Sequence, residues 1–288
     1  MRSLTISSPA KVNLFLKVLG RRRDGYHELL TRFHRISLQD QLVLKKIKTP
    51  QFRLITTHLK LRSVRKNLIY KAYRLLKNSA DWQGGVEVKL RKRIPIAAGL
   101  GGGSSNAAHF LLGMNRLFGL QLSKAALVKI GAQIGSDVPF FLYQTKEAIG
   151  TGRGEKIKVI PCRHKLWFVL VVPQSGISTV HVYQQLKAAP LTRISADATI
   201  TSDFSRGTRK KEKGYRLHND LFPVSSRFEP QLKQIDALFD QVGAPERLMS
   251  GSGPSMFSIH PFKEEAEKVA RRIQRLKLNA QVFVCHTY

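Results

Sequence analysis

The segment Pro95-Ile-Ala-Ala-Gly-Leu-Gly-Gly-Gly-Ser-Ser105 decides the fold that we expect for this chain. It follows a predicted strand over 86–90 and precedes a predicted helix over 106–118, so the local order is strand, glycine-rich loop, helix. Glycines leave backbone N–H groups uncovered, and the N-terminus of a helix carries a partial positive charge. Both features favour a bound phosphate, although a plain linker can have the same composition. The segment matches neither a Walker A sequence nor the dinucleotide-binding spacing.

The rest of the chain predicts an α+β protein of two domains, which we expect over 1–158 and 159–288. Asn67 is a predicted N-cap for the helix that follows it. A polar, basic stretch over 188–216 has no periodicity and is expected to be a flexible excursion. The predicted strands are 4–7, 12–19, 33–38, 41–47, 52–57, 86–90, 166–172, 246–249, 255–260 and 280–286, and the further predicted helices are 123–134, one from 179, 229–242 and 262–276.

Composition and apolar run length describe a globular protein that stays in water. The 288 residues are 42% hydrophobic, and the longest apolar run, 166–172, is far shorter than the roughly 20 residues that cross a bilayer. We therefore expect no membrane partner. No apolar segment precedes the strand predicted from Leu4, so we expect a cytoplasmic protein.

Two cysteines, Cys162 and Cys285, are too few for a disulfide framework or a cysteine metal cluster. We expect both to be buried free thiols, and their spacing predicts no metal site.

The formal net charge of +30, from 49 Lys and Arg against 19 Asp and Glu, attracts nucleic acid, acidic membranes and anionic substrates alike. Basic residues gather in 21–23, 45–66 and 206–216, and we expect most of them to form solvated surface. The excess is larger than a small anionic substrate requires. Nucleic acid therefore remains an alternative partner.

Three further motifs contain polar residues that could serve either in a catalytic or binding site or in the fold alone. Lys11 and Asn13 are two apart on a predicted strand and so share one face. Asp137, in Gly135-Ser-Asp-Val-Pro139, precedes a short apolar turn and, taken alone, is typical of an N-cap. Met249-Ser-Gly-Ser-Gly-Pro-Ser255 is typical of a hairpin turn between two strands.

The order of these motifs resembles that of the GHMP kinases. The resemblance is strongest to the members that phosphorylate a diphosphocytidyl sugar alcohol in the non-mevalonate isoprenoid pathway. It implies a two-domain architecture, with an N-terminal ribosomal-protein-S5-like domain and a C-terminal ferredoxin-like α/β sandwich domain. The motifs that carry it are Ser8-Pro-Ala-Lys-Val-Asn-Leu14, Arg23-Asp-Gly-Tyr-His-Glu-Leu29, Gly99-Leu-Gly-Gly-Gly-Ser-Ser-Asn-Ala-Ala108, Gly135-Ser-Asp-Val-Pro139, His218-Asn-Asp-Leu221 and Gly251-Ser-Gly-Pro254.

The resemblance also implies roles for individual residues, with ATP and Mg²⁺ as cofactors and no protein metal ligand assigned. Asp137 would act as the base for the acceptor hydroxyl, with Lys11 beside it, which suits a reaction that needs mainly alignment and charge neutralisation. The acceptor would contact Asn13, Tyr26, His27, Phe33 and Tyr183, with its cytosine between aromatic rings. ATP would contact Asn67, Lys92, Pro95, Ala97, Gly99, Leu100, Gly101, Gly102, Gly103, Ser104 and Ser105.

Alternatives remain for both the residues and the function. Phe33 and Tyr183 also suit core positions. Another GHMP kinase, acting on mevalonate, homoserine or a sugar, would keep Asp137 and the glycine-rich loop but would not need Tyr26 and His27. A basic nucleic-acid-binding protein is the reading from another functional class, and the basic segment over 205–216 keeps it in view.

Overall fold

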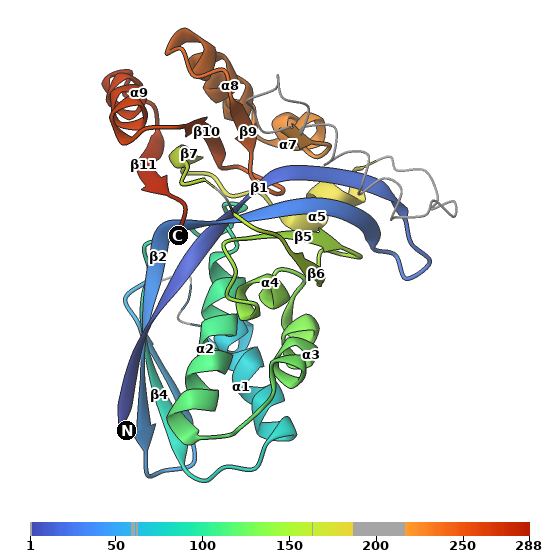
Figure 1. Cartoon of the computed structure of the whole chain (residues 1–288), viewed down its shortest axis with the longest axis vertical. Coiled ribbons are helices and arrows are strands. Elements are labelled where there is room, and N and C mark those ends of the chain that lie inside the picture. The colour runs from blue at the N-terminus through green and yellow to red at the C-terminus, as the bar shows by residue number, and fades with distance from the viewer. Residues whose placement is uncertain (1, 59–60, 62, 163, 187–216) are drawn as a thin grey trace.

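Two β-sheets with helices packed against them make up the computed structural model, which describes residues 2–58, 61, 63–162, 164–186 and 217–288 (Figure 1). The predicted α+β class is confirmed. The stretch over 188–216, with its basic segment, lies outside the described residues. Within the described part of the chain, none of the helices has the length and apolar character needed to cross a membrane.

The first sheet has seven strands and is built on two long ones, β1 (Ser3–Arg21) and β2 (His27–Ile47), which pair antiparallel. The sequence predicted two shorter strands in place of each. The register shift at Pro9/Ala10 explains part of the difference, because a bulge interrupts the two-residue alternation on which strand prediction relies. The remaining strands are β3 (Phe52–Thr56), β4 (Gly85–Arg91), β5 (Glu147–Thr151), β6 (Lys156–Val159) and β8 (His218–Asn219), of which β5, β6 and β8 were not predicted.

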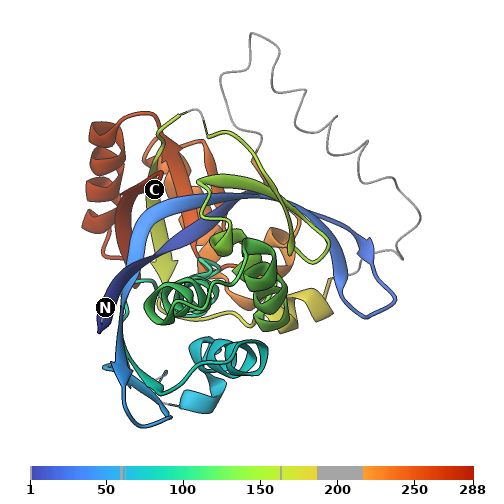
Figure 2. The ribbon, with the colours of Figure 1, turned by 60° about the horizontal axis from the view of Figure 1, so that its bottom comes forward.

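Helices α1 (Leu68–Ser79), α2 (Gly102–Phe118) and α3 (Lys124–Ile134) cover one face of this sheet, and Figure 2 shows β1 and β2 arching over them. The predicted N-cap is confirmed, since the Asn67 side chain accepts a hydrogen bond from Ile69 N at 2.9 Å. Helix α2 begins earlier than predicted, because the glycine-rich loop itself forms its first turn. Two short elements, the 3₁₀ helix η2 (Val64–Lys66) and α4 (Val138–Leu142), complete this part.

The second sheet has the strand order β11-β7-β10-β9, with every neighbouring pair antiparallel. One face of β7 packs on helices α8 and α9, and the other packs on β1 and β2 of the first sheet. We propose that the domain boundary lies at 158–159, at the end of β6. The elements are β7 (Trp167–Pro173), α5 (Thr179–Gln184), α7 (Phe222–Phe228), α8 (Gln231–Gln241), β9 (Arg247–Met249), β10 (Met256–His260), α9 (Lys263–Arg275) and β11 (Ala280–His286), of which α7 was not predicted.

The two cysteines differ in their surroundings. Cys285 is buried, as expected, but Cys162 is only partly buried, which corrects the expectation of two buried thiols. Cys162 lies in the connection between β6 and β7, where Pro161 and His164 are exposed. A connecting segment that runs over the surface covers its side chains less completely than a central strand does.

His109 of α2 gives the fold a specific dependence on pH. Its side chain is 4% exposed, and its Nδ1 donates a hydrogen bond to Ser105 O at 2.8 Å. Burial lowers the pKa of His109 to about 4, from an ordinary value near 6.5. As pH falls through the ordinary value, the unfolded chain takes up a proton at His109 while the folded chain does not. The stabilisation is therefore complete at neutral pH and is lost progressively as pH falls toward the folded pKa.

When the pH falls from about 7 to about 5, we expect proton uptake at His109 in the unfolded chain alone to lower the free energy of unfolding by about 2 kcal/mol. Urea unfolding of wild-type protein and of His109→Gln at both pH values measures this contribution, and the variant should lose less stability on acidification. The exposed His164→Gln variant is the matched control and should behave like wild type. An equal loss in wild type and His109→Gln would contradict the assignment.

Candidate active site

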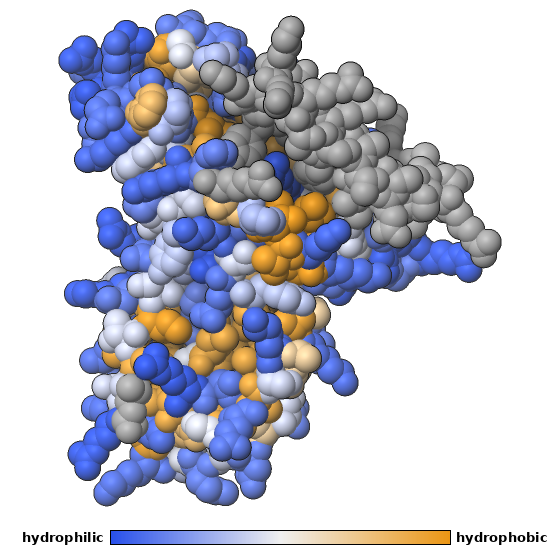
Figure 3. All heavy atoms as spheres, viewed as in Figure 1, coloured by the Kyte–Doolittle hydropathy of each residue, from blue (hydrophilic) through white to orange (hydrophobic). Residues whose placement is uncertain are grey.

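A cavity of about 850 Å³ opens between the glycine-rich loop, the β1–β2 hairpin, α4, α5 and the turn between β9 and β10. Its walls are partly apolar, and Figure 3 shows hydrophobic residues gathered near α5 and β5 on one face of the molecule. The structure brings nearly all of the sequence-predicted site residues together around this cavity. These are Lys11, Asn13, Tyr26, His27, Phe33, Asn67, Lys92, Pro95, Ala97, Gly99, Leu100, Gly101, Gly102, Gly103, Ser104, Asp137 and Tyr183.

The glycine-rich loop turns directly into α2 and presents the N-terminus of that helix to the cavity. Gly101 is the N-cap residue, with a left-handed φ of 67° that favours glycine, and the first turn contains no acidic residue. A Cβ atom on Gly102 would lie 2.9 Å from Ile94 Cγ2 and 3.0 Å from Lys92 Nζ, so the close packing at this position favours glycine. First-turn amides have no partner within their own helix, and the helix dipole makes them attractive to anions. The loop is thus built to hold phosphate groups.

Ser105 is the one predicted site residue that the structure places elsewhere. Its side chain is fully buried, and its hydroxyl donates to Pro9 O at 2.6 Å. Its backbone N–H donates to Gly101 O at 2.8 Å, inside the helix. The expectation that Ser105 faces the nucleotide phosphates is therefore corrected: Ser105 ties α2 to β1.

Asp40 is the buried anchor of the glycine-rich loop and was missed by the sequence analysis. One carboxylate oxygen accepts from Arg93 N at 2.8 Å and from Ile94 N at 2.9 Å, where the loop begins. The other accepts from Lys92 Nζ at 2.5 Å and from Asn106 Nδ2 at 2.9 Å. Burial lowers the pKa of Lys92, and Asp40 opposes that effect. The carboxylate therefore fixes both ends of the loop and a lysine on the cavity wall.

A signal for Asp40 was present in the sequence. Asp40, Leu42 and Leu44 alternate along β2 and so point to the same side of the strand, and all three are buried. An acid on an apolar strand face must find partners when it is buried. The periodicity could have singled out Asp40, but the identity of its partners depends on the fold.

Lys11 and Asp137 meet at the centre of the cavity. Lys11 is 3% exposed, its Nζ donates to Asn13 Oδ1 at 2.5 Å, and it lies 3.5 Å from Asp137 Oδ2 and 5.6 Å from the centre of the Phe33 ring. Asp137 occupies the N-cap position of α4, yet its side chain makes no capping hydrogen bond. The capping interpretation of that side chain is therefore wrong, and its carboxylate faces a lysine instead.

The turn between β9 and β10 is a hairpin, as predicted, but it also closes the site. Ser250 Oγ donates to Gly99 O at 3.0 Å and accepts from Asn13 N at 3.3 Å. Asn219 Nδ2 donates to the carbonyls of Met249 and Gly251 at 2.7 and 2.8 Å. The turn thus joins the glycine-rich loop to β1, which fixes the strand that carries Lys11.

Aromatic rings and cationic side chains line the other end of the cavity. The rings of His27 and Tyr183 stack with centres 5.4 Å apart, and the Arg153 guanidinium lies 4.7 Å from the centre of the Tyr26 ring. Burial and, to a lesser degree, the charge of Arg21 lower the pKa of His27, which favours the neutral form of its ring. His27 Nε2 is buried and has no hydrogen-bond partner among the described residues. This end can stack a planar ring and hydrogen-bond its edge.

Phe33 is both a core residue and a residue of the cavity wall, which are the two interpretations that the sequence left open. It is 1% exposed and stacks on Phe140 of the core at 5.0 Å between ring centres, but it also borders the cavity beneath Lys11. Tyr183 likewise packs against the core of the second sheet while lining the cavity.

Comparison with known proteins shows the family to which this chain belongs. The model of the GHMP kinases N terminal domain matches residues 67–145. A 4-diphosphocytidyl-2-C-methyl-D-erythritol kinase of Moorella thermoacetica is 40% identical over 95% of this chain and 96% of its own, and one of Syntrophus aciditrophicus is 38% identical over 92% of each. The chain belongs to the 4-diphosphocytidyl-2-C-methyl-D-erythritol kinase family. A crystal structure of 4-(cytidine 5'-diphospho)-2C-methyl-D-erythritol kinase agrees, with 32% identity, a TM-score of 0.78 and coverage of 98% of this chain and 99% of that one.

Membership in the 4-diphosphocytidyl-2-C-methyl-D-erythritol kinase family makes the chain a phosphotransferase. The superfamily match spans Asn67, the glycine-rich loop and Asp137, whereas Lys11 and the hairpin that carries Tyr26 and His27 precede it. The placement within the superfamily therefore rests on the relatives that align along nearly the whole chain.

We expect Asp40→Asn to weaken ATP binding by on the order of 10-fold, because a neutral amide replaces charge-assisted bonds to Lys92 and to the start of the loop. Calorimetric titration with ATP measures the affinity, and circular dichroism verifies that the variant is folded. The exposed Asp81→Asn variant is the matched control. Unchanged ATP affinity in folded Asp40→Asn would show that Asp40 does not position the loop.

Proposed function

We propose that this chain transfers the γ-phosphoryl group of ATP to the 2-hydroxyl of 4-diphosphocytidyl-2-C-methyl-D-erythritol, as a cytoplasmic enzyme of isoprenoid precursor synthesis. One observation carries the proposal beyond the family likeness. A phosphate-type glycine loop, a lysine–aspartate pair and an aromatic end that can hydrogen-bond border a single cavity. Such a cavity can hold a nucleotide and a cytidyl acceptor with the reacting groups between them.

The glycine-rich loop is the proposed site of the ATP phosphates. The N-terminus of α2, which no side chain caps, and Lys92 supply positive potential, and both border the cavity. Ser104 lines the same cavity, and its hydroxyl is the group that we propose for Mg²⁺, because hard cations prefer oxygen ligands. When bound, Mg²⁺ neutralises charge on the phosphate oxygens.

Asp137 and Lys11, at the centre of the cavity, are the residues that we propose for removing the proton of the acceptor hydroxyl and stabilising the resulting charge. Asp137 accepts the proton of the acceptor hydroxyl, and the Lys11 ammonium, held by Asn13, stabilises the negative charge that develops on the attacking oxygen. Asn13 is itself fixed, since its Nδ2 donates to Thr31 Oγ1 at 2.7 Å. Asn13 Oδ1 is occupied by Lys11, so we propose that Asn13 acts mainly by orienting that ammonium.

The aromatic end is the proposed cytosine site. Tyr26 and Tyr183 supply ring faces, and the unpartnered His27 Nε2 can hydrogen-bond the base edge. Arg21 and Arg153 border the cavity beside them, where the acceptor diphosphate carries its negative charge. Other GHMP kinases, whose acceptors lack a base, would have no use for this group of residues.

The acceptor specificity tests the function directly. Purified full-length protein with ATP and Mg²⁺ should consume ATP with 4-diphosphocytidyl-2-C-methyl-D-erythritol and not with mevalonate or homoserine, because only the first presents a cytosine to Tyr26 and His27. Product formation measured by phosphorus NMR verifies transfer to the acceptor. Turnover with mevalonate or homoserine instead would refute the cytosine site, and salt-sensitive RNA binding without any turnover would favour the nucleic-acid alternative.

A further inference from the structure

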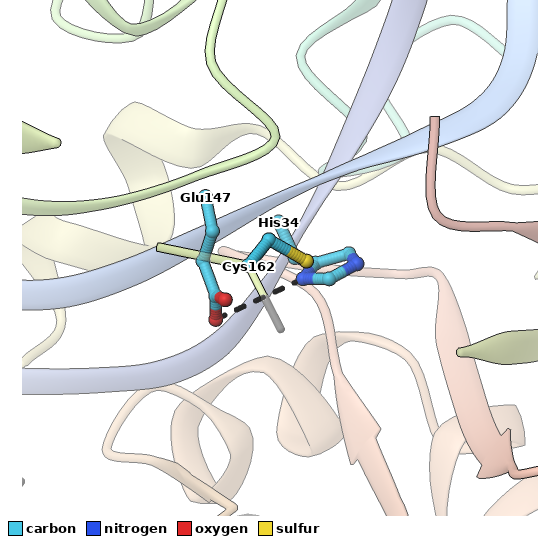
Figure 4. Close-up of side chains that lie close together, drawn as sticks. All are labelled: His34, Glu147 and Cys162. Atoms are coloured by element: carbon cyan, nitrogen blue, oxygen red, sulfur yellow. Dashed lines mark ion pairs between the residues drawn. The ribbon is translucent and has the colours of Figure 1, made fainter. Parts of the chain in front are cut away.

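Three metal-binding residue types converge on the face of β2 that points away from the cavity. His34 follows Phe33 on β2, so the two side chains point to opposite faces, and the His34 ring lies 5.3 Å from the Phe168 ring of β7. Glu147 of β5 is the direct cross-strand partner of His34. Cys162 reaches the same place from the connection between β6 and β7. One ligand atom from each residue lies within 4.8 Å of the others, and Figure 4 shows the three side chains turned toward one another.

His34 presents a ring nitrogen to this cluster without a hydrogen bond. The ring is fully buried, and its Nε2 lies 2.9 Å from Thr287 Oγ1. Nδ1 has no hydrogen-bond partner among the described residues, and it lies 3.8 Å from Glu147 Oε1, beyond hydrogen-bond distance. When Nε2 donates its proton to Thr287, Nδ1 directs a lone pair toward a carboxylate oxygen. The Nδ1 lone pair and the carboxylate oxygen repel each other, and a cation bound between them removes this repulsion.

Thr287 holds the imidazole in the orientation that metal ligation requires. Its Oγ1 also accepts a hydrogen bond from Leu166 N at 2.9 Å, so the hydroxyl is fixed by the backbone of the same connection that carries Cys162. A ligating histidine commonly donates its other ring N–H to an oxygen, which fixes the tautomer. Arg32 Nε donates a hydrogen bond to Glu147 Oε1, the oxygen that also faces His34 Nδ1, and so places a positive charge beside this almost fully buried carboxylate.

We infer that His34, Glu147 and Cys162 bind a thiophilic divalent cation of the zinc class, with water as a fourth ligand. Imidazole, thiolate and carboxylate are the ligands that zinc takes in proteins, whereas Mg²⁺ prefers oxygen alone. Tetrahedral zinc sites place ligand atoms about 3.3 to 3.8 Å apart, so a modest contraction of this cluster is sufficient. Cys162 is partly exposed, which leaves water a route to the fourth position. Coordination displaces the Cys162 thiol proton to solvent.

The location gives the ion a structural role. His34 and Glu147 belong to the first sheet, and Cys162 belongs to the segment that leads into β7 of the second sheet. An ion bound to all three fastens that connection to the centre of the first sheet. It does so behind Phe33, on the face opposite the Lys11–Asp137 pair, so it takes no part in phosphoryl transfer.

Zinc titration of the full-length protein, with any affinity tag removed and metals stripped by a chelator, tests this site. We expect wild type to bind one equivalent of Zn²⁺ tightly, and Cys162→Ser to bind it at least 10-fold more weakly, because a hydroxyl is a poor substitute for a thiolate. Cys285→Ala is the matched control, since it removes the other cysteine and should bind zinc like wild type. Zinc should also raise the melting temperature of wild type but not that of Cys162→Ser.

Cobalt(II) in place of zinc reports the ligands themselves. Wild type and Cys285→Ala should show the near-ultraviolet charge-transfer band of a cobalt–thiolate bond, and Cys162→Ser should lack it. No tight zinc binding by wild type, which would mean that a proton alone bridges His34 and Glu147, would overturn the inference. Equal zinc affinity in wild type and Cys162→Ser, or no thiolate band with cobalt, would also overturn it.

Discussion

The buried ammonium of Lys11 is the constraint on which the arrangement of the site depends. A charge with 3% exposure must be compensated, and Asn13, Asp137 and the face of Phe33 all supply partial or full negative charge to it. These partners come from β1, the start of α4 and β2. Lys11 N also donates to Leu100 O at 3.0 Å, which ties the same residue to the glycine-rich loop. Satisfying one lysine thus brings the phosphate loop and the aspartate to the same point.

Acidic residues hold this basic protein together at positions close to the site. Asp40 binds the start of the glycine-rich loop, and Asp220 accepts from Val18 N at 2.7 Å, where β8 meets β1. Glu28 accepts from Gly152 N at 2.9 Å and pairs with Arg22, which steadies the hairpin that carries Tyr26 and His27. Because these few carboxylates are engaged within the protein, the cavity keeps a positive character that suits polyanionic substrates.

The sequence predicted best those helices, strands and turns whose formation depends on residues close to them along the chain. The cap at Asn67 and the strand, loop and helix around the glycines depend on neighbours in the sequence, and they were predicted well. The short strands β5 and β8 pair with the distant strands β2 and β1, and β6 pairs with β5 just before it. Their sequences carry too little alternation to reveal these pairings. Ser105 and Asp40 show the same limit within the site. Which way Ser105 turns, and what Asp40 binds, is decided by β1 and by α2 crossing the sheet.

Asp137 is the residue on which the catalytic account turns, and the single-turnover rate of Asp137→Asn with ATP and 4-diphosphocytidyl-2-C-methyl-D-erythritol tests it most directly. The account predicts a folded variant with wild-type ATP affinity and a rate reduced by on the order of 10² or more, since the amide cannot accept the hydroxyl proton. The exposed Asp81→Asn variant should react at the wild-type rate. A near-wild-type rate in Asp137→Asn would remove Asp137 from the chemistry and contradict the account.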